Sequence, residues 1–460
     1  MAMAAVRQMM PSAAEDGRPA AAAIVRAERH LIQPWPFAGS IGTEARSFIG
    51  AGDGIYITDG DGKRLIDGPA GMWCVNAGHR RRELVEAMAE QAMALSYNTP
   101  WYTMNEPSAQ LAERIAAHAP GDLDHVFFAG SGSEAADSAL KIALAYWNVS
   151  GKAAKTRLIG RERGYHGVGF GGISVGGMSN NRKFFGSLLT GVDHLAHTYD
   201  REKQAFSKGE PEYGAHFADD LERIVALHDA STIAAVIVEP MAGSTGVLPP
   251  PKGYLQRLRA ICDKHGILLI FDEVITGFGR LGTAFAAERY GVIPDMITFA
   301  KGVTSGTVPM AGVIVRKGIY DAFMRGPEHV IELFHGYTYS AHPLACAAGI
   351  ATLDVYRDEK LFERAAALEG KWADAAMSLK GTPGVLDIRT LGLVAAIDLS
   401  SRPDAFGKRA YDSMERAFHE HGLMFRITGD TIALSPPLIV TEDQIGEIFD
   451  KVKTVIRQVN

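Results

Sequence analysis

The stretch Gly266-Ile267-Leu268-Leu269-Ile270-Phe271-Asp272-Glu273-Val274 contains a short apolar run that ends on two carboxylates. A second run, residues 295–300, ends directly before Lys301. Both are rich in branched or aromatic residues and bounded by turn residues, which predicts buried strands of a parallel sheet. A third run, residues 233–238, leads into Glu239. The sequence therefore predicts one α/β sheet whose strand ends carry acids and an amine.

These charged strand ends indicate a functional site. In open α/β sheets the ligand crevice lies beyond the carboxyl ends of the strands, so we expect Glu239, Asp272 and Lys301 to line one crevice. A lysine in a partly dry pocket can form a Schiff base with a carbonyl, and a buried carboxylate can hold a proton on a heterocyclic nitrogen. Pyridoxal phosphate needs both groups. The alternative is a structural Asp272 and a solvated Lys301, which would be favoured for a random pair but fits two buried strand ends less well.

Composition restricts the class of protein. With 460 residues, 47% of them hydrophobic, the chain can bury a large core and more than one domain. A net charge of −6 without a basic tract argues against a nucleic-acid partner. Cys74, Cys262 and Cys346 have no metal-ligand spacing, which indicates free thiols and no metal site. No apolar run is long enough to span a membrane and residues 1–29 do not resemble a transit peptide, so we expect a cytoplasmic protein without a membrane partner.

The hydrophobic pattern predicts an arm and two domains. Residues 1–30 are expected to form a loosely ordered N-terminal arm. Residues 31–82 contain an alternating pattern around an Asp-Gly turn at 55–67, which predicts a hairpin in the N-terminal part of a small domain. Residues 83–353 alternate between helical and strand patterns, which predicts the large domain with its mainly parallel sheet. Residues 354–460, with helices expected at 359–380, 409–421 and 442–459 and strands at 385–389 and 393–398, complete a smaller α+β domain.

A small-residue motif, Gly130-Ser131-Gly132-Ser133-Glu134, lies between a strand expected at 126–128 and a helix expected at 135–147. Backbone amides and hydroxyls at such a helix start can hold a dianionic phosphate. The alternative is an ordinary serine cap with a glutamate in the first turn, which the motif alone favours.

A glycine-rich stretch, residues 163–172, matches the dinucleotide pattern GxGxxG at Gly167, Gly169 and Gly172. That site needs a helix to follow, and residues 173–177 are not expected to be helical, so we reject it. Tyr165 and His166 could face a ligand from this loop.

Two further features have ordinary interpretations. Spacing alone favours a surface salt bridge for Arg426. His419-Glu420-His421 lacks the spacing of a zinc-binding helix and predicts a solvated helix end.

Together these motifs resemble the class III aminotransferases of PLP fold type I over nearly the whole chain. The closest resemblance is to the ω-amino acid:pyruvate, or β-alanine:pyruvate, aminotransferases. It rests on the motifs at residues 70–79 (Ala-Gly-Met-Trp-Cys-Val-Asn-Ala-Gly-His), 164–169, 239–247, 335–343 and 435–442.

The resemblance implies that Lys301 binds pyridoxal 5'-phosphate as a Schiff base and that Asp272 pairs with the pyridine nitrogen. Lys301, once released, would move the proton between substrate and cofactor carbons. It also implies active sites at the interface of a homodimer or of a dimer of dimers. The remaining cofactor-binding residues would be Ser131, Gly132, Ser133, Tyr165, His166, Glu239, Val274 and Thr338, the last of these reaching the phosphate of the neighbouring subunit.

The resemblance also bears on the amino acceptor. Relatives that use glutamate and 2-oxoglutarate typically carry glutamate at the position of Ser244 and arginine at that of Ala433. Arg426 matches instead the mobile arginine of pyruvate-using relatives, whose charged hydrogen bond contributes about 1.5–3 kcal/mol. Phe37, Trp73 and Tyr165 would wall the substrate pocket. One departure is Gly130, where relatives usually have asparagine, and it affects the phosphate loop.

The implied activity is transfer of the amino group of an ω-amino acid or a primary amine to pyruvate, giving L-alanine and an aldehyde or ketone. A diamine or 4-aminobutyrate transaminase that still uses pyruvate is the nearest alternative. A PLP-dependent aminomutase or decarboxylase would need no acceptor. A non-enzymatic role leaves Lys301 and Asp272 without a purpose.

Overall fold

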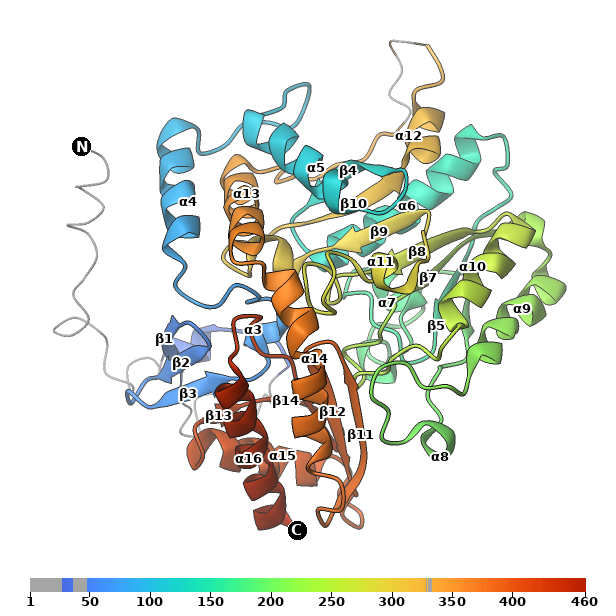
Figure 1. Cartoon of the computed structure of the whole chain (residues 1–460). Coiled ribbons are helices and arrows are strands. Elements are labelled where there is room, and N and C mark those ends of the chain that lie inside the picture. Colours follow the sequence, from blue (N-terminus) through green and yellow to red (C-terminus); the bar gives the residue numbers. More distant parts are fainter. Residues whose placement is uncertain (1–26, 36–47, 328, 330–332) are drawn as a thin grey trace.

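The computed structural model describes residues 27–35, 48–327, 329 and 333–460. Most of the expected arm, and Phe37, lie outside the described residues. In the described part, the strands form three sheets, of which the largest has seven strands (Figure 1).

The seven-stranded sheet has the order β4-β10-β9-β8-β7-β5-β6. Neighbours from β6 to β9 pair in parallel, and β10 is antiparallel to both β9 and β4. The strands β7 and β8 are buried along their whole length, as expected for a sheet covered on both faces. The predicted mainly parallel sheet is confirmed. Its strands are β4 (Leu123–Ala129), β5 (Arg157–Arg161), β6 (Val192–Leu195), β7 (Ile233–Val238), β8 (Leu268–Asp272), β9 (Met296–Phe299) and β10 (Ala311–Arg316).

Helices connect and cover these strands. The helix α6 packs against β4, β7, β8, β9 and β10, and α10 packs against β8. The helices of this part are α4 (Arg82–Ala94), α5 (Glu106–His118), α6 (Gly132–Val149), α7 (Phe170–Val175), α8 (Arg201–Gln204), α9 (Asp220–His228), α10 (Tyr254–His265), α11 (Ala286–Tyr290), α12 (Lys317–Phe323) and α13 (Pro343–Asp358). Residues 353 and 354, between which the domain boundary is predicted, both lie in α13, and the division into domains stays a prediction.

The first strands of the chain and its C-terminal segments lie together in the smaller part of the molecule. In Figure 1 the blue N-terminal strands lie beside the red C-terminal helices. The predicted hairpin is confirmed as β2 (Tyr56–Asp59) and β3 (Arg64–Asp67), and the sheet adds β1 (Ile49–Asp53) and a C-terminal strand, β13 (Leu423–Met424), parallel to β3.

A third sheet, of order β11-β12-β15-β14, is antiparallel. Its strands are β11 (Val385–Leu391), β12 (Val394–Leu399), β14 (Arg426–Thr428) and β15 (Thr431–Leu434). The three C-terminal helices predicted from the sequence are confirmed as α14 (Leu361–Met377), α15 (Lys408–His419) and α16 (Glu442–Val459).

One local prediction was wrong. Residues 173–177 were not expected to be helical, but the helix α7 includes Ile173 to Val175. The glycines nevertheless serve packing: a Cβ at Gly167 would lie 2.4 Å from Ser133 Oγ, and one at Gly169 would lie 2.3 Å from an oxygen of Asp137. Both glycines therefore allow the loop to pack closely on the first turns of α6.

Among the described residues, no helix is long and apolar enough to cross a membrane. The same residues contain no cluster of histidine, cysteine and acidic side chains that could hold a metal ion.

Candidate active site

The carboxyl ends of β7, β8 and β9 supply three charged side chains to one cavity. Glu239 follows β7, Asp272 closes β8, and Lys301 lies two residues beyond the end of β9. The cavity has a volume of about 180 Å³. It is lined by Met72, Gly132, Ser133, Tyr165, His166, Gly167, Glu239, Asp272, Val274, Ile275, Ala300 and Lys301. The structure thus brings together the acids and the amine that the strand ends predicted.

Lys301 is placed by an unusual backbone conformation. Its φ of 49° lies in the left-handed region, and the residue opens a short 3₁₀ helix, Lys301–Thr304. Burial lowers the pKa of its amine, Asp272 acts in the opposite direction, and the charge of Arg426 lowers the pKa further. The amine therefore loses its proton at a lower pH than a solvated lysine, which suits a nucleophile and proton carrier.

Asp272 is buried and held in a fixed orientation. Its Oδ2 lies 2.7 Å from His166 Nδ1, and its Oδ1 accepts hydrogen bonds from the Thr298 hydroxyl at 3.1 Å and the Val274 N–H at 3.2 Å. The Nε2 atom of His166 is buried and has no hydrogen-bond partner among the described residues. A carboxylate fixed in this way presents a defined edge to the cavity.

Glu239 connects the two loops that border the cavity. Its carboxylate accepts hydrogen bonds from the Tyr165 N–H at 2.9 Å and the Gly243 N–H at 3.0 Å. Burial raises the pKa of Glu239 and also that of the Tyr165 phenol. Glu239 therefore fixes the backbone of Tyr165 relative to the loop that carries Ser244.

The start of α6 forms another wall of the cavity. Ser131 caps the helix by accepting the Glu134 N–H at 3.2 Å, and Ser133 Oγ accepts the Val168 N–H at 3.0 Å. The Gly130 N–H donates to Glu134 Oε2 at 2.6 Å. Gly132 and Ser133 line the cavity. The serine cap is thus real, and the helix N-terminus also faces the cavity, so the two interpretations of the motif are compatible.

Arg426 is not a surface salt-bridge residue. It lies half-buried on β14, opposite Ala433 of β15, and forms no ion pair among the described residues. Burial lowers the pKa of its guanidinium, and its charge acts on both Lys301 and Tyr165. Ser244 is buried nearby, and its carbonyl accepts the Thr428 hydroxyl at 2.9 Å.

Other predicted residues lie away from the cavity surface. Trp73 is 1% exposed and packs beneath Gly243, whereas its neighbour Met72 lines the cavity. Thr338 is exposed, and its carbonyl accepts the Tyr97 hydroxyl at 3.0 Å.

Sequence reasoning did not single out Met72, Gly167 or Ile275 as lining residues. The motif at residues 70–79 contains both Met72 and Trp73, but its sequence does not show which of the two side chains faces the cavity. His419 and Glu420 are exposed, as expected of a solvated helix end.

The donor set fits pyridoxal phosphate. The cavity combines an amine of lowered pKa, a buried oriented carboxylate and the N-terminus of an 18-residue helix. These groups match an aldehyde, a pyridine nitrogen and a phosphate, respectively.

Comparisons with known proteins agree with this arrangement. The family model Aminotransferase class-III matches residues 41–456. An omega-aminotransferase of Caulobacter vibrioides is 59% identical over 413 residues, 90% of this chain and 94% of that protein. A beta-alanine–pyruvate aminotransferase of Pseudomonas aeruginosa is 48% identical over 408 residues, 88% of this chain and 90% of that protein. The solved structure of an (S)-enantioselective omega-transaminase from Thermomicrobium roseum matches with a TM-score of 0.90 at 34% identity, covering 97% of this chain and 100% of that one.

Proposed function

Because this chain belongs to the class III aminotransferases, we propose that it moves the amino group of an ω-amino acid such as β-alanine, or of a primary amine, to pyruvate. The products are L-alanine and an aldehyde or ketone. Class III aminotransferases depend on pyridoxal phosphate in general, and we propose that Lys301 binds it here. The observation that carries the proposal is the single cavity shared by Lys301, Asp272 and the start of α6.

When bound, pyridoxal phosphate supplies an aldehyde that an amine can attack and a ring that takes up electrons from the substrate carbon. Lys301 binds through Nζ. In its neutral form, Lys301 Nζ would also accept and carry the proton of the substrate carbon. Asp272 would hold the proton on the ring nitrogen, and the contact with His166 Nδ1 keeps the Asp272 carboxylate in position.

The surrounding residues orient the cofactor. We propose that Tyr165 and Val274 hold the two faces of the ring and that Ser131, Gly132 and Ser133 bind the phosphate. The supporting observation is that Val274, Tyr165, Gly132 and Ser133 line the same cavity. Glu239 acts through the backbone of Tyr165, because its carboxylate accepts a hydrogen bond from the Tyr165 N–H.

Arg426 is proposed to bind the carboxylate of pyruvate. Its half-buried place and its electrostatic effect on Lys301 support this role. Ser244 and Ala433 supply no charge that would select a second carboxylate, so pyruvate is favoured over 2-oxoglutarate. Phe37 and Tyr165 are proposed to wall the substrate pocket, which would also admit amines that lack a carboxylate. The buried Trp73 would act behind this wall, where it packs against Gly243.

We propose a homodimer as the functional unit. The support is a cluster of exposed aromatic residues: Trp101 packs edge-on against both Tyr102 and Phe334, and all three are more than half exposed. Exposed apolar surface of this kind marks protein interfaces. Thr338, proposed to reach the partner's phosphate, lies four residues from Phe334. Light scattering of the purified protein would test the assembly.

The test of the activity is stoichiometry. With β-alanine and pyruvate, we expect one L-alanine formed for each pyruvate consumed. Turnover of the amine without pyruvate would instead indicate an aminomutase or decarboxylase. Faster turnover with putrescine or 4-aminobutyrate than with β-alanine would favour the diamine or 4-aminobutyrate alternative.

A further inference from the structure

The β14–β15 hairpin, which carries Arg426, contacts the loop that carries Ser244. The contact is made by the residue pair of the hairpin that lies next to its turn. Thr428 and Thr431 face each other where β14 meets β15. The Thr428 hydroxyl donates to the Ser244 carbonyl at 2.9 Å. On the other strand, a Cβ placed on Gly246 would lie 3.1 Å from Thr431 Cγ2, so loop and hairpin are in close contact.

A buried ion pair ties the same loop to Thr431. Arg389, on β11, is 1% exposed and donates from Nε to the Val247 carbonyl at 3.0 Å and from a terminal nitrogen to the Gly246 carbonyl at 2.8 Å. Two further bonds of 2.7 Å join it to the Asp398 carboxylate. Asp398 Oδ1 in turn accepts the Thr431 hydroxyl at 2.7 Å. A continuous chain of bonds therefore runs from the loop to the hairpin.

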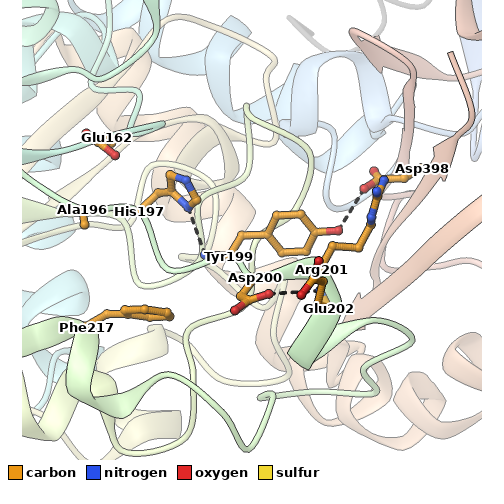
Figure 2. Close-up of a pocket in the computed structure, with 9 residues that line it drawn as sticks. All are labelled: Glu162, Ala196, His197, Tyr199, Asp200, Arg201, Glu202, Phe217 and Asp398. Carbon is orange, nitrogen blue, oxygen red and sulfur yellow. Dashed lines mark hydrogen bonds between the residues drawn. The ribbon is translucent and has the colours of Figure 1, made fainter.

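Two more groups complete this network. Arg389 also pairs with Asp387, and the Tyr199 hydroxyl donates to Asp387 at 2.8 Å and to Asp398 at 3.1 Å. Figure 2 shows the Tyr199 hydroxyl pointing at Asp398, and both residues line a cavity of about 580 Å³. Burial opposes the charge on Arg389, but the hydrogen bond and charge of Asp398 outweigh it and raise the pKa of Arg389. Arg389 therefore stays ionised, and its charge-assisted hydrogen bonds hold it in one position.

We propose that Thr428 and Thr431 are positioning residues for recognition of the substrate carboxylate. Through Ser244 and through the Arg389–Asp398 pair, they hold the hairpin against the loop and so set where the Arg426 backbone stands relative to the cavity. This inference rests on the proposed role of Arg426. It adds that carboxylate preference depends on residues that touch no substrate.

The test uses Thr428→Val and Thr431→Val, which remove one hydroxyl each and keep the β-branched shape. Holoenzyme is assayed with pyruvate and with butanal, an acceptor that lacks a carboxylate, using one common amine donor. Losing one hydrogen bond predicts a rise of about three- to ten-fold in the KM for pyruvate. The KM and kcat for butanal should stay within about two-fold. Thr454→Val, which removes an exposed hydroxyl on α16, is the matched control and should change neither acceptor.

A binding measurement removes the dependence on turnover. Propanoate carries a carboxylate but cannot react, and its binding should raise the melting temperature of the holoenzyme. The apparent Kd from this titration should rise in both variants by the same factor as the KM for pyruvate. Equal losses with pyruvate and butanal, or an unchanged Kd for propanoate, would overturn the inference.

Arg426→Ala separates this inference from the proposed function. In that background, the threonine variants should add no further rise in the KM for pyruvate, because coupled residues are not additive. If they still add their full effect, they act by another route and the inference fails. If Arg426→Ala alone leaves the KM for pyruvate unchanged, the proposed role of Arg426 fails first.

Discussion

Nδ1 of His166 lies 2.7 Å from Oδ2 of Asp272, and both side chains are buried. We predict that His166→Ala weakens retention of pyridoxal phosphate about 10- to 100-fold, because a hydrogen bond to a charged group contributes about 1.5–3 kcal/mol. Titration of the apoenzyme with the cofactor measures this. His166→Asn, whose amide N–H can replace Nδ1–H, should recover most of the affinity. Equal losses in both variants would show that the imidazole acts by its shape and not by this bond.

Arg426→Ala is predicted to raise the KM for pyruvate about 10- to 100-fold, since one charge-assisted bond to the carboxylate is lost. The KM for butylamine, a donor without a carboxylate, should change little, as expected when an interaction is lost with one substrate only. Arg426→Lys keeps the positive charge but lacks the planar guanidinium. Its KM for pyruvate should lie between the values of the wild type and of Arg426→Ala. Similar losses with pyruvate and butylamine would make Arg426 a structural residue.

The lowered pKa of Lys301 predicts how cofactor uptake depends on pH. Only the neutral amine attacks an aldehyde, so covalent uptake by the apoenzyme should accelerate as the pH rises through the pKa of Lys301. Because burial lowers this pKa, the midpoint should lie below the ordinary value of 10.5. Absorbance after rapid mixing follows the reaction, and Lys301→Ala should show no covalent uptake. A midpoint at or above the ordinary value would contradict the buried position of the amine.

Gly160 tests the packing behind the site. A Cβ there would lie 1.8 Å from the Val175 carbonyl oxygen, so β5 and α7 would have to move apart. We predict that Gly160→Ala destabilises the protein by about 1–3 kcal/mol. Gly318→Ala is the control: no atom lies within 4 Å of the new methyl group on the exposed face of α12, and the change should stabilise by about 0.5–1 kcal/mol. The melting temperatures of the two variants are measured at one scan rate. Equal melting temperatures for Gly160→Ala and Gly318→Ala would contradict the close contact at Gly160.

The sequence predicted the elements whose signal is local. The hairpin β2–β3, the buried strands β7 to β9 and the helix α16 follow from alternation, apolar runs and helical periodicity, which need no knowledge of the rest of the chain. The meeting of Glu239, Asp272 and Lys301 also followed, because parallel strands place their carboxyl ends at one edge.

Features that depend on tertiary packing were not predictable in this way. The short helix α7 forms in a glycine-rich stretch of low helix propensity, where Asp137 accepts the Gly172 N–H and α6 packs closely. Met72, not Trp73, faces the cavity, and the positive φ of Gly71 and Trp73 on either side of it departs from any regular local pattern. The network around Arg389 joins β11, β12 and β15 to the loop at residues 246–247 and to Tyr199, which no pattern along the chain indicates.

The most direct test of the central claim is a half-reaction on the purified holoenzyme. β-Alanine should bleach the absorption band of the bound cofactor, and pyruvate should then restore it while 2-oxoglutarate does not. That result would support both the transaminase activity and the acceptor preference assigned to Arg426, Ser244 and Ala433. Restoration by 2-oxoglutarate alone would contradict the acceptor preference, and a band that β-alanine never bleaches would contradict the proposed donor.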